Sequence, residues 1–216
     1  MTESKGIDSF PIRSAEPGRI EAFSDGVFAV AITMLVLDIR APQTENGRLI
    51  ADLIAQWPAY LAYAMSFAYV SIIWFNHHVM FNRIERVDKG FTFTNLVLLF
   101  TTALLPFPTA VLADALQAGD EANMSVAIAL YALVAGIMCG AWLMVYEYVV
   151  RHPALAVNDG TRYFHGDRAR ALLGITGYTL AGGVGFVTPV VVPLVILAVL
   201  PAFYFVTSHG MARSEP

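Results

Sequence analysis

The chain has 216 residues, of which 57% are hydrophobic and only 14% are charged, and its mean hydropathy is +0.61. A soluble globule of this length needs a larger share of polar residues, so the composition argues against a soluble fold and favours an all-α integral membrane protein. The net charge is −4 and the basic residues are dispersed, which argues against the basic patch that nucleic-acid binding requires.

The apolar segments recur at the length of about 20 residues that a helix needs to cross a bilayer. Residues 1–18 contain no apolar stretch of the kind found in signal peptides, so we interpret them as a cytoplasmic N-terminal tail. Six transmembrane helices are predicted, over residues 19–40, 58–82, 91–116, 124–150, 169–187 and 189–208. They form one transmembrane domain over residues 19–208, and residues 209–216 form a cytoplasmic C-terminal tail.

Prolines and glycines mark the breaks between and within these helices. Residues 47–57, just before Pro58, are interpreted as a short helix in the membrane interface. Pro106 and Pro108 lie late in the third predicted span and are expected to bend it. The glycine-rich residues 182–185 separate the last two spans, which are otherwise continuous in their apolar character.

The basic residues indicate how the helices are oriented. If the N-terminus is cytoplasmic, six spans leave only Arg40 and Arg48 outside, and the other 11 of the 13 Lys and Arg residues lie inside. The positive-inside rule supports this topology, with both termini cytoplasmic. We therefore expect a multi-pass protein of a bacterial inner membrane.

Polar residues inside the predicted spans cluster at one depth. Asp25 lies about 9 Å into the first span. His77 and His78 lie near the inner end of the second span and Asn95 near the inner start of the third. Because unpaired polar groups are costly in a membrane, we predict one polar network. Its predicted members are Arg19, Phe23, Ser24, Asp25, Trp74, Asn76, His77 and Asn95.

Such a network can lock helices together, or it can serve catalysis or proton relay. A metal site is disfavoured, because His77 and His78 are adjacent and point about 100° apart on a helix. No metal or other cofactor is expected.

The first span carries a helical stripe of Val30, Thr33, Met34 and Leu37, which recur at i, i+3, i+4 and i+7. This pattern is typical of ordinary helix packing, and periodicity alone does not distinguish packing from the lining of a pore. The role of Asp38 at the outer end is equally undecided from the sequence. It is either a solvated residue at a helix end or, if copies of the chain surround a symmetry axis, one member of a carboxylate ring that concentrates cations.

Three motifs narrow these alternatives. Residues 19–25 read Arg-Ile-Glu-Ala-Phe-Ser-Asp, residues 74–78 read Trp-Phe-Asn-His-His, and Asn95 is followed by Leu-Leu-Pro-Phe-Pro at residues 104–108. The first of these resembles the R-x-x-x-F-S-D signature that opens the first helix of the lysosomal/endosomal potassium channel family. The chain looks most like the bacterial members of that family.

The resemblance implies a potassium-permeable channel in which four identical subunits surround one axis and the first helices line the pore. It assigns Val30, Met34 and Leu37 to a hydrophobic constriction, Thr33 to a selectivity layer and Asp38 to the outer mouth. Val30 departs from the pattern, since the family often has a larger residue there, and the narrowest ring is then expected at Met34 or Leu37. Potassium would be the permeant ion, and the partners would be other copies of the chain and the lipid bilayer.

Two other classes of function fit the sequence less well. A proton-coupled secondary transporter would use Asp25 and His77 as its coupling site, but inverted repeats and paired broken helices are absent from the sequence. An intramembrane enzyme would need a motif such as Gly-x-Ser-x-Gly or His-Glu-x-x-His, and neither is present. We therefore do not expect an enzyme.

Overall fold

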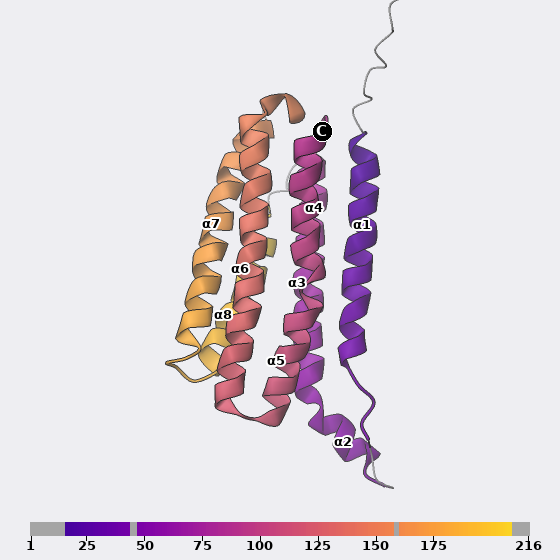
Figure 1. The fold of residues 1–216 in the computed structure, drawn as a ribbon, viewed down its shortest axis with the longest axis vertical. Coiled ribbons are helices and arrows are strands. Elements are labelled where there is room, and N and C mark those ends of the chain that lie inside the picture. The colour runs from indigo at the N-terminus through magenta and orange to yellow at the C-terminus, as the bar shows by residue number, and fades with distance from the viewer. Residues whose placement is uncertain (1–15, 44–46, 158–159, 209–216) are drawn as a thin grey trace, which may run out of the picture.

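The protein is a bundle of long helices that lie side by side (Figure 1). The computed structural model describes residues 16–43, 47–157 and 160–208, and the predicted tails fall almost wholly outside these ranges. The helices are α1 (Pro17–Met34), α2 (Leu49–Ala55), α3 (Trp57–Phe81), α4 (Lys89–Ala103), α5 (Pro106–Ala118), α6 (Glu121–Arg151), α7 (Gly160–Val184) and α8 (Val191–Val206). Two short 3₁₀ helices, η1 (Leu35–Asp38) and η2 (Pro153–Leu155), follow α1 and α6.

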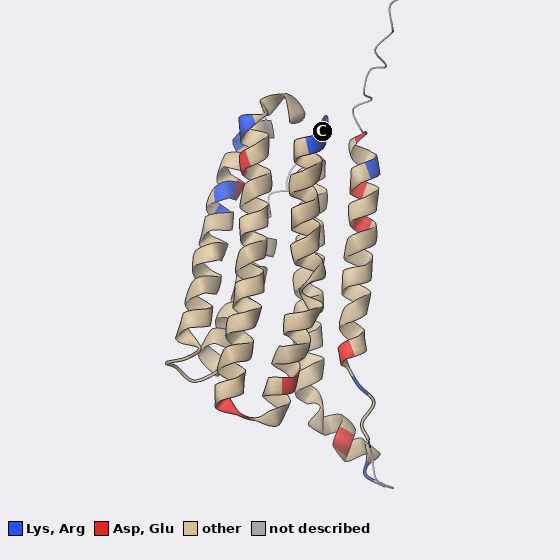
Figure 2. Cartoon of the chain, viewed as in Figure 1, with Lys and Arg blue, Asp and Glu red and all other residues tan. Residues whose placement is uncertain are grey.

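Four helical segments of the described residues are long and apolar enough to cross a membrane: Pro17–Asp38, Trp57–Phe81, Lys89–Ala118 and Glu121–Arg151. They match the first four predicted spans within three residues at each end. Charged residues lie mostly toward the two ends of the helices (Figure 2). This distribution suits a bundle whose middle section is surrounded by hydrocarbon.

The last two helices differ more from the prediction. α7 begins at Gly160, whereas the predicted fifth span begins at residue 169, so its first third carries charged residues. α8 is apolar but only 16 residues long. Both helices pack in the same bundle, α7 against α6 and α8 against α3, α6 and α7.

The bend predicted in the third span is a break between two helices. α4 ends at Ala103 and α5 begins at Pro106. Pro106 and Pro108 have no backbone N–H, so they cannot donate to the carbonyl groups four residues earlier. The chain bridges the gap with tighter bonds, from Leu105 N to Thr102 O and from Phe107 N to Leu104 O, of 3.1 Å each.

Side-chain capping fixes where two of the helices begin. Asp88 accepts a hydrogen bond from the backbone N–H of Phe91 at 2.7 Å and caps α4, and Asp120 accepts one from Ala122 and caps α6. Gly119 has φ 71°, a left-handed conformation that favours glycine, and it ends α5. Gly119 and Asp120 together therefore place the tight turn between α5 and α6.

α1 lies at the edge of the bundle and packs against α3 and α4 (Figure 1). Its buried side chains are Ser24, Phe28, Ala31 and Leu35, spaced by three or four residues. Leu35 is fully buried and Phe28 is 1% exposed. One face of α1 therefore joins the core, and the opposite face has no partner within the described subunit.

The predicted interfacial helix is present as α2, which projects from the end of the bundle beside α3 (Figure 1). Its side chains Ile50 and Ile54 are strongly exposed, as is Trp57 at the start of α3. An apolar helix with an adjacent tryptophan is typical of a segment at the level of the lipid headgroups. Its position in the interface stays a prediction.

Candidate functional site

The stripe predicted on the first helix lies on the exposed face of α1. Val30 is 57% exposed, Met34 48% and Leu37 70%, and Thr33 is exposed between them. The structure thus brings these four residues together on one face, turned away from α3 and α4. Such a face suits hydrocarbon or further copies of the same helix.

Thr33 contributes the hydroxyl group of this stripe. Its Oγ1 donates a hydrogen bond to the carbonyl oxygen of Val30 at 2.9 Å. The hydroxyl proton is therefore used within the helix, and the oxygen lone pairs remain available on the exposed side. Asp38 ends the stripe at the far end of η1, where it is half-buried.

A buried chain of hydrogen bonds joins α1, α4 and α3. Asn95 Nδ2 donates to Ser24 Oγ at 3.0 Å, and Asn95 Oδ1 lies 2.9 Å from His77 Nε2. All three residues are fully buried. The amide oxygen can only accept, so His77 Nε2 donates, and this fixes the ring as the tautomer that carries a proton on Nε2.

Aromatic rings surround the histidine of this chain. Phe28, Phe81 and Trp142 have ring centroids 5.0, 4.7 and 6.4 Å from that of His77. The Nδ1 atom of His77 is buried and has no hydrogen-bond partner among the described residues. A histidine enclosed in this way holds helices together and is poorly placed to exchange protons with water.

A second, more exposed pair of contacts ties α1 to α3. Trp74 Nε1 donates to Asp25 Oδ1 at 2.9 Å, and His78 Nδ1 lies 2.9 Å from Glu21 Oε1. The rings of Trp74 and His78 stack at 6.2 Å between centroids. Glu21 had no part in the predicted network, although its four-residue spacing from Asp25 matches that of Trp74 from His78 on the facing helix.

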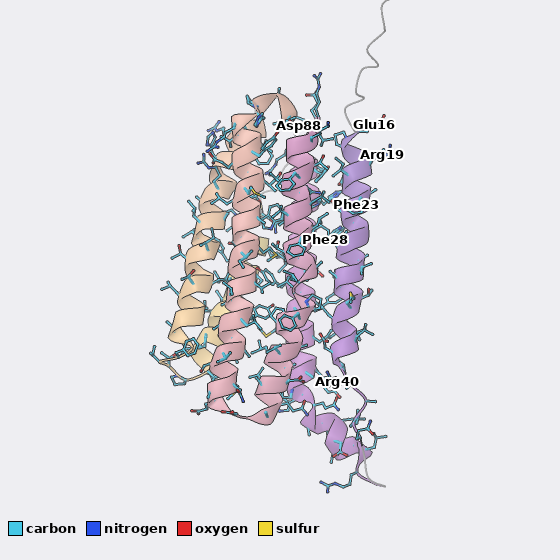
Figure 3. All side chains as sticks on the ribbon, viewed as in Figure 1. Glu16, Arg19, Phe23, Phe28, Arg40 and Asp88 are labelled. Atoms are coloured by element: carbon cyan, nitrogen blue, oxygen red, sulfur yellow. The ribbon has the colours of Figure 1, made fainter. Side chains whose placement is uncertain are left out.

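Three predicted members of the network lie elsewhere. Arg19 is exposed and makes no side-chain hydrogen bond or ion pair within the described part of the chain, and Phe23 is 57% exposed. Both lie on α1, as Figure 3 shows. Asn76 faces α7 and α8, because one residue along a helix turns a side chain by about 100° from the direction of His77. Its Oδ1 accepts from Arg170 Nη2 at 3.3 Å.

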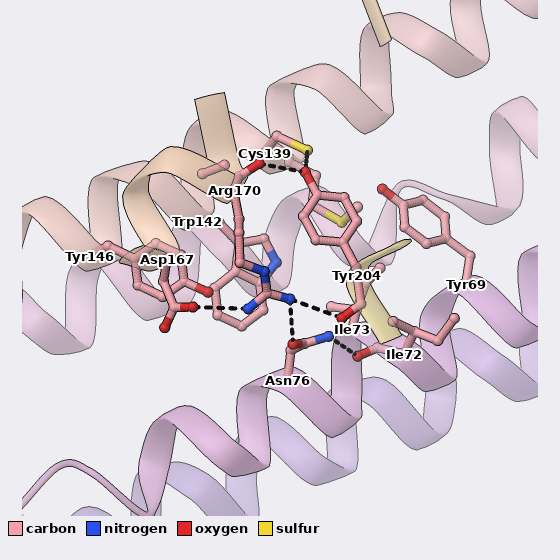
Figure 4. Close-up of a pocket in the computed structure, with 12 residues that line it drawn as sticks. Tyr69, Ile72, Ile73, Asn76, Cys139, Trp142, Tyr146, Asp167, Arg170 and Tyr204 are labelled. Carbon is pink, nitrogen blue, oxygen red and sulfur yellow. Dashed lines mark hydrogen bonds and ion pairs between the residues drawn. The ribbon is translucent and has the colours of Figure 1, made fainter. Parts of the chain in front are cut away.

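Asn76 belongs to a buried ionic cluster that is absent from the predicted site (Figure 4). Asp167 accepts from Arg170 Nη1 at 2.9 Å and from Arg83 Nη1 at 3.3 Å. Arg170 also donates to the backbone carbonyl of Tyr204 at 2.9 Å, and the hydroxyl of Tyr204 donates to the carbonyl of Arg170 at 3.0 Å. The cluster joins α3, α7 and α8 beside a cavity of about 30 Å³.

The signal for this cluster was the Asp167-x-x-Arg170 spacing, which places both side chains on one face of a helix. The predicted fifth span begins at residue 169 and leaves Asp167 in a loop, where this spacing has no helical meaning. As for metals, no three His, Cys, Asp or Glu side chains lie close enough to hold an ion within residues 16–43, 47–157 and 160–208.

Comparison with known proteins connects this geometry to a family. The family described as "Endosomal/lysosomal potassium channel TMEM175" matches residues 19–106. A potassium channel of Streptomyces collinus is 42% identical over 175 residues, which cover 80% of this chain and 84% of that protein. A potassium channel of Chamaesiphon minutus is 50% identical over 103 residues, about half of each chain.

The fold has a solved counterpart as well. The crystal structure of a lysosomal potassium-selective channel TMEM175 homolog from Chamaesiphon minutus matches with a TM-score of 0.78 and 32% identity. The match covers 89% of this chain and 98% of that chain. It therefore extends well beyond residues 19–106, the part that the family description matches.

Proposed function

Because the chain belongs to the endosomal/lysosomal potassium channel family, we propose that it is a potassium-permeable channel whose pore is lined by α1 from several copies of the chain. The observation that carries this proposal is the exposed apolar face of α1. On one side of this helix Phe28 and Leu35 are almost fully buried, while on the other Val30 and Leu37 are more than half exposed.

The position of α1 supports a symmetric assembly. It lies at the edge of the bundle and leaves its second face unpartnered among the described residues over about two turns, from Val30 to Leu37 (Figure 1). Identical helices can meet along such a face around a shared axis. We propose four copies, with Val30, Met34 and Leu37 as rings of a hydrophobic constriction.

Each part of this face has a distinct physical role. An apolar ring can gate a pore because water leaves a narrow hydrocarbon-lined passage, while oxygen atoms replace part of the hydration shell of an ion. Thr33 supplies such oxygen atoms between the apolar rings. Asp38, at the end of the stripe, supplies negative charge that attracts cations to the outer mouth.

The buried chain of Ser24, Asn95 and His77 holds this pore helix in place from behind. It lies on the face of α1 opposite the stripe, so it acts on the pore through the position of the helix and makes no contact with the ion path. We propose the same positioning role for the pair of Asp25 and Trp74.

The transporter hypothesis gains no support from these contacts. It requires Asp25 and His77 to share a proton, but Asp25 pairs with Trp74 and His77 with Asn95. We further propose that the protein lies in a bacterial cell membrane with both termini cytoplasmic, as the distribution of Lys and Arg favours.

The test is ion flux through purified protein in liposomes. We expect passive potassium flux down its gradient without a coupling ion. Val30→Asn, Met34→Asn and Leu37→Asn should each raise this flux, because an amide group allows water to remain in the constriction. Leu133→Asn, at a 59% exposed position of α6, is the matched control and should leave flux unchanged.

Two results would contradict the proposal. One is potassium uptake that requires a proton gradient, which would favour a transporter. The other is a set of three asparagine variants that conduct like the parent protein, which would remove α1 from the ion path. An image of the assembly down its symmetry axis tests the fourfold arrangement separately.

A further inference from the structure

A large apolar cavity lies between α3 and α8, and no residue of α1 lines it. Its volume is about 200 Å³, and its walls come from α3, α5, α6 and α8. Ala62, Ser66 and Tyr69 of α3 form its floor and are buried, while Ala198 and Ala202 of α8 lie at its edge and are exposed. The cavity is therefore a groove that opens at the side of the subunit.

Small side chains account for the groove. α8 contributes Ala198, Pro201 and Ala202 to it, and α3 contributes Ala62 and Ala68. These side chains are too short to fill the space between the two helices. Close-packed proteins leave few voids of this size, so a groove of about 200 Å³ calls for an occupant.

The walls favour an apolar occupant, since the hydroxyl of Tyr69 is the one buried side-chain polar group of the lining without a hydrogen-bond partner among the described residues. No charged side chain lines the groove. The hydroxyl of Ser66 is already bonded to Thr109 at 2.8 Å and to Tyr131 at 3.3 Å. A buried water needs two to four polar partners, and the groove has too few hydrogen-bonding groups to supply them. A dry apolar cavity of about 150 Å³, by contrast, can hold benzene.

The position of the groove along the helices indicates which apolar molecules surround it. Along α3 it runs from Leu61 to Ile72, about 6 to 22 Å from the start of that helix. Along α8 it runs from Leu194 to Ala202, about 5 to 17 Å from the start. Both stretches fall within the hydrocarbon core, which is about 30 Å thick, and phospholipid acyl chains are the surrounding solvent there.

We propose that the groove between α3 and α8 is a binding site for one acyl chain of a membrane phospholipid, which enters past Ala198 and Ala202 and reaches Tyr69. The bound group is the chain alone, because the walls offer nothing that would hold a charged headgroup. This site is separate from the stripe on α1, so it does not depend on ion conduction through the proposed pore.

The experiment is photo-crosslinking in liposomes of phosphatidylethanolamine and phosphatidylglycerol. A trace of phosphatidylglycerol carries a diazirine in the middle of one acyl chain, and mass spectrometry locates the labelled residues. We expect label on the buried floor residues Ala62, Ser66 and Tyr69, which free lipid at the outer surface cannot reach.

Two variants of α8 separate the groove from the general surface. Ala198→Phe fills the groove and should abolish label on the floor, while label on the exposed Leu133 of α6 persists. Val199→Phe adds an aromatic ring at the next residue, which is 57% exposed and outside the groove, and should leave floor labelling intact. Ala202→Leu provides a smaller filling variant if Ala198→Phe does not fold.

Three results would overturn the proposal. The first is a parent protein labelled at Leu133 but not on the floor. The second is floor labelling that survives both filling variants. The third is crosslinking of the floor to another copy of the chain, which would make the groove a subunit contact. Potassium flux through the same liposomes is a separate readout, so failure of the channel proposal would not be mistaken for failure of this one.

Discussion

The Oδ1 atom of Asn95 lies 2.9 Å from Nε2 of His77, and this contact links α4 to α3 in the middle of the core. Through its Nδ2 atom the same asparagine reaches Ser24 of α1. One amide group thus joins three helices with its donor and its acceptor. Asn95 is therefore the residue on which the position of α1 depends most directly.

Asn95→Ala should destabilise the protein. The substitution leaves His77 Nε2 without its acceptor and Ser24 Oγ without its donor, and each abandoned buried group costs about 1–3 kcal/mol. Chemical unfolding in detergent would measure the free energy of unfolding. Asn123→Ala is the control, because Asn123 is exposed at the start of α6, where it donates to the cap residue Asp120, and it should change stability by no more than about 1 kcal/mol. Equal effects of the two variants would show that the buried chain of bonds adds nothing.

Asp167→Asn should be more damaging. Asp167 is 7% exposed and is the carboxylate that pairs with both Arg83 and Arg170. Removal of its charge leaves two largely buried arginines unpaired, at a cost of about 3–5 kcal/mol. The same unfolding measurement applies.

Glu147→Gln serves as its control. Glu147 pairs with Arg151 and Arg168 in a more solvent-exposed position, where an ion pair is worth about 1 kcal/mol or less. The double variant Asp167→Asn/Arg170→Met should lose less stability than Asp167→Asn alone, because it removes one of the two stranded charges. A double variant with a lower free energy of unfolding than Asp167→Asn alone would refute this account of the cluster.

The arginine and aspartate cluster also shows what sequence patterns miss. The first four spans were predicted closely because each is a long apolar run, and the face of α1 was predicted because its residues follow helical periodicity. The early start of α7 was not predicted, because Arg162, Asp167 and Arg168 look like residues of a loop. Asp167 and Arg168 are accommodated because they pair with Arg83 and Glu147, which lie in distant parts of the chain, and sequence spacing does not reveal such pairs.

The predicted polar network was limited in the same way. Ser24, His77 and Asn95, which the sequence predicts at one level of the bundle, are joined by hydrogen bonds. Depth does not specify direction around a helix, and for this reason Asn76 was grouped with His77 although it faces α7. The partner of Asp25 proved to be Trp74, which had been included, while the pairing of His78 with Glu21 became visible only in three dimensions.

Gly174→Ala should disturb the packing of α7 on α8. A Cβ atom at Gly174 would collide with the hydroxyl of Tyr204 and lie 2.7 Å from Cys139 Sγ. Tyr204 cannot move aside freely, because its hydroxyl and its carbonyl both bond to Arg170. We expect a loss of about 1–3 kcal/mol in unfolding free energy. Gly174→Ala/Tyr204→Phe should recover part of it by removing the hydroxyl.

The control for that substitution is Gly166→Ala in the same helix. A Cβ atom at Gly166 meets nothing within 4 Å. Alanine in a helix interior is favoured over glycine by about 0.5–1 kcal/mol, so this variant should be slightly more stable than the parent. A matching loss at both positions would mean that the contact with Tyr204 does not explain the effect at Gly174.

Thr33→Val tests whether α1 offers oxygen atoms to the ion. Valine keeps the shape of threonine, so it removes the hydroxyl while leaving the width of the proposed pore nearly unchanged. If Thr33 replaces part of the hydration shell, the permeability ratio of potassium to sodium should fall by up to about tenfold, which corresponds to about 1.4 kcal/mol. Reversal potentials measured with potassium on one side of the membrane and sodium on the other report this ratio.

Thr176→Val is the matched control, because Thr176 is exposed on α7 and its hydroxyl also donates to its own helix, to Leu172 O at 3.0 Å. A ratio that is unchanged in Thr33→Val while conduction persists would mean that the ion keeps its water at this level, and selectivity would then have to arise elsewhere along α1.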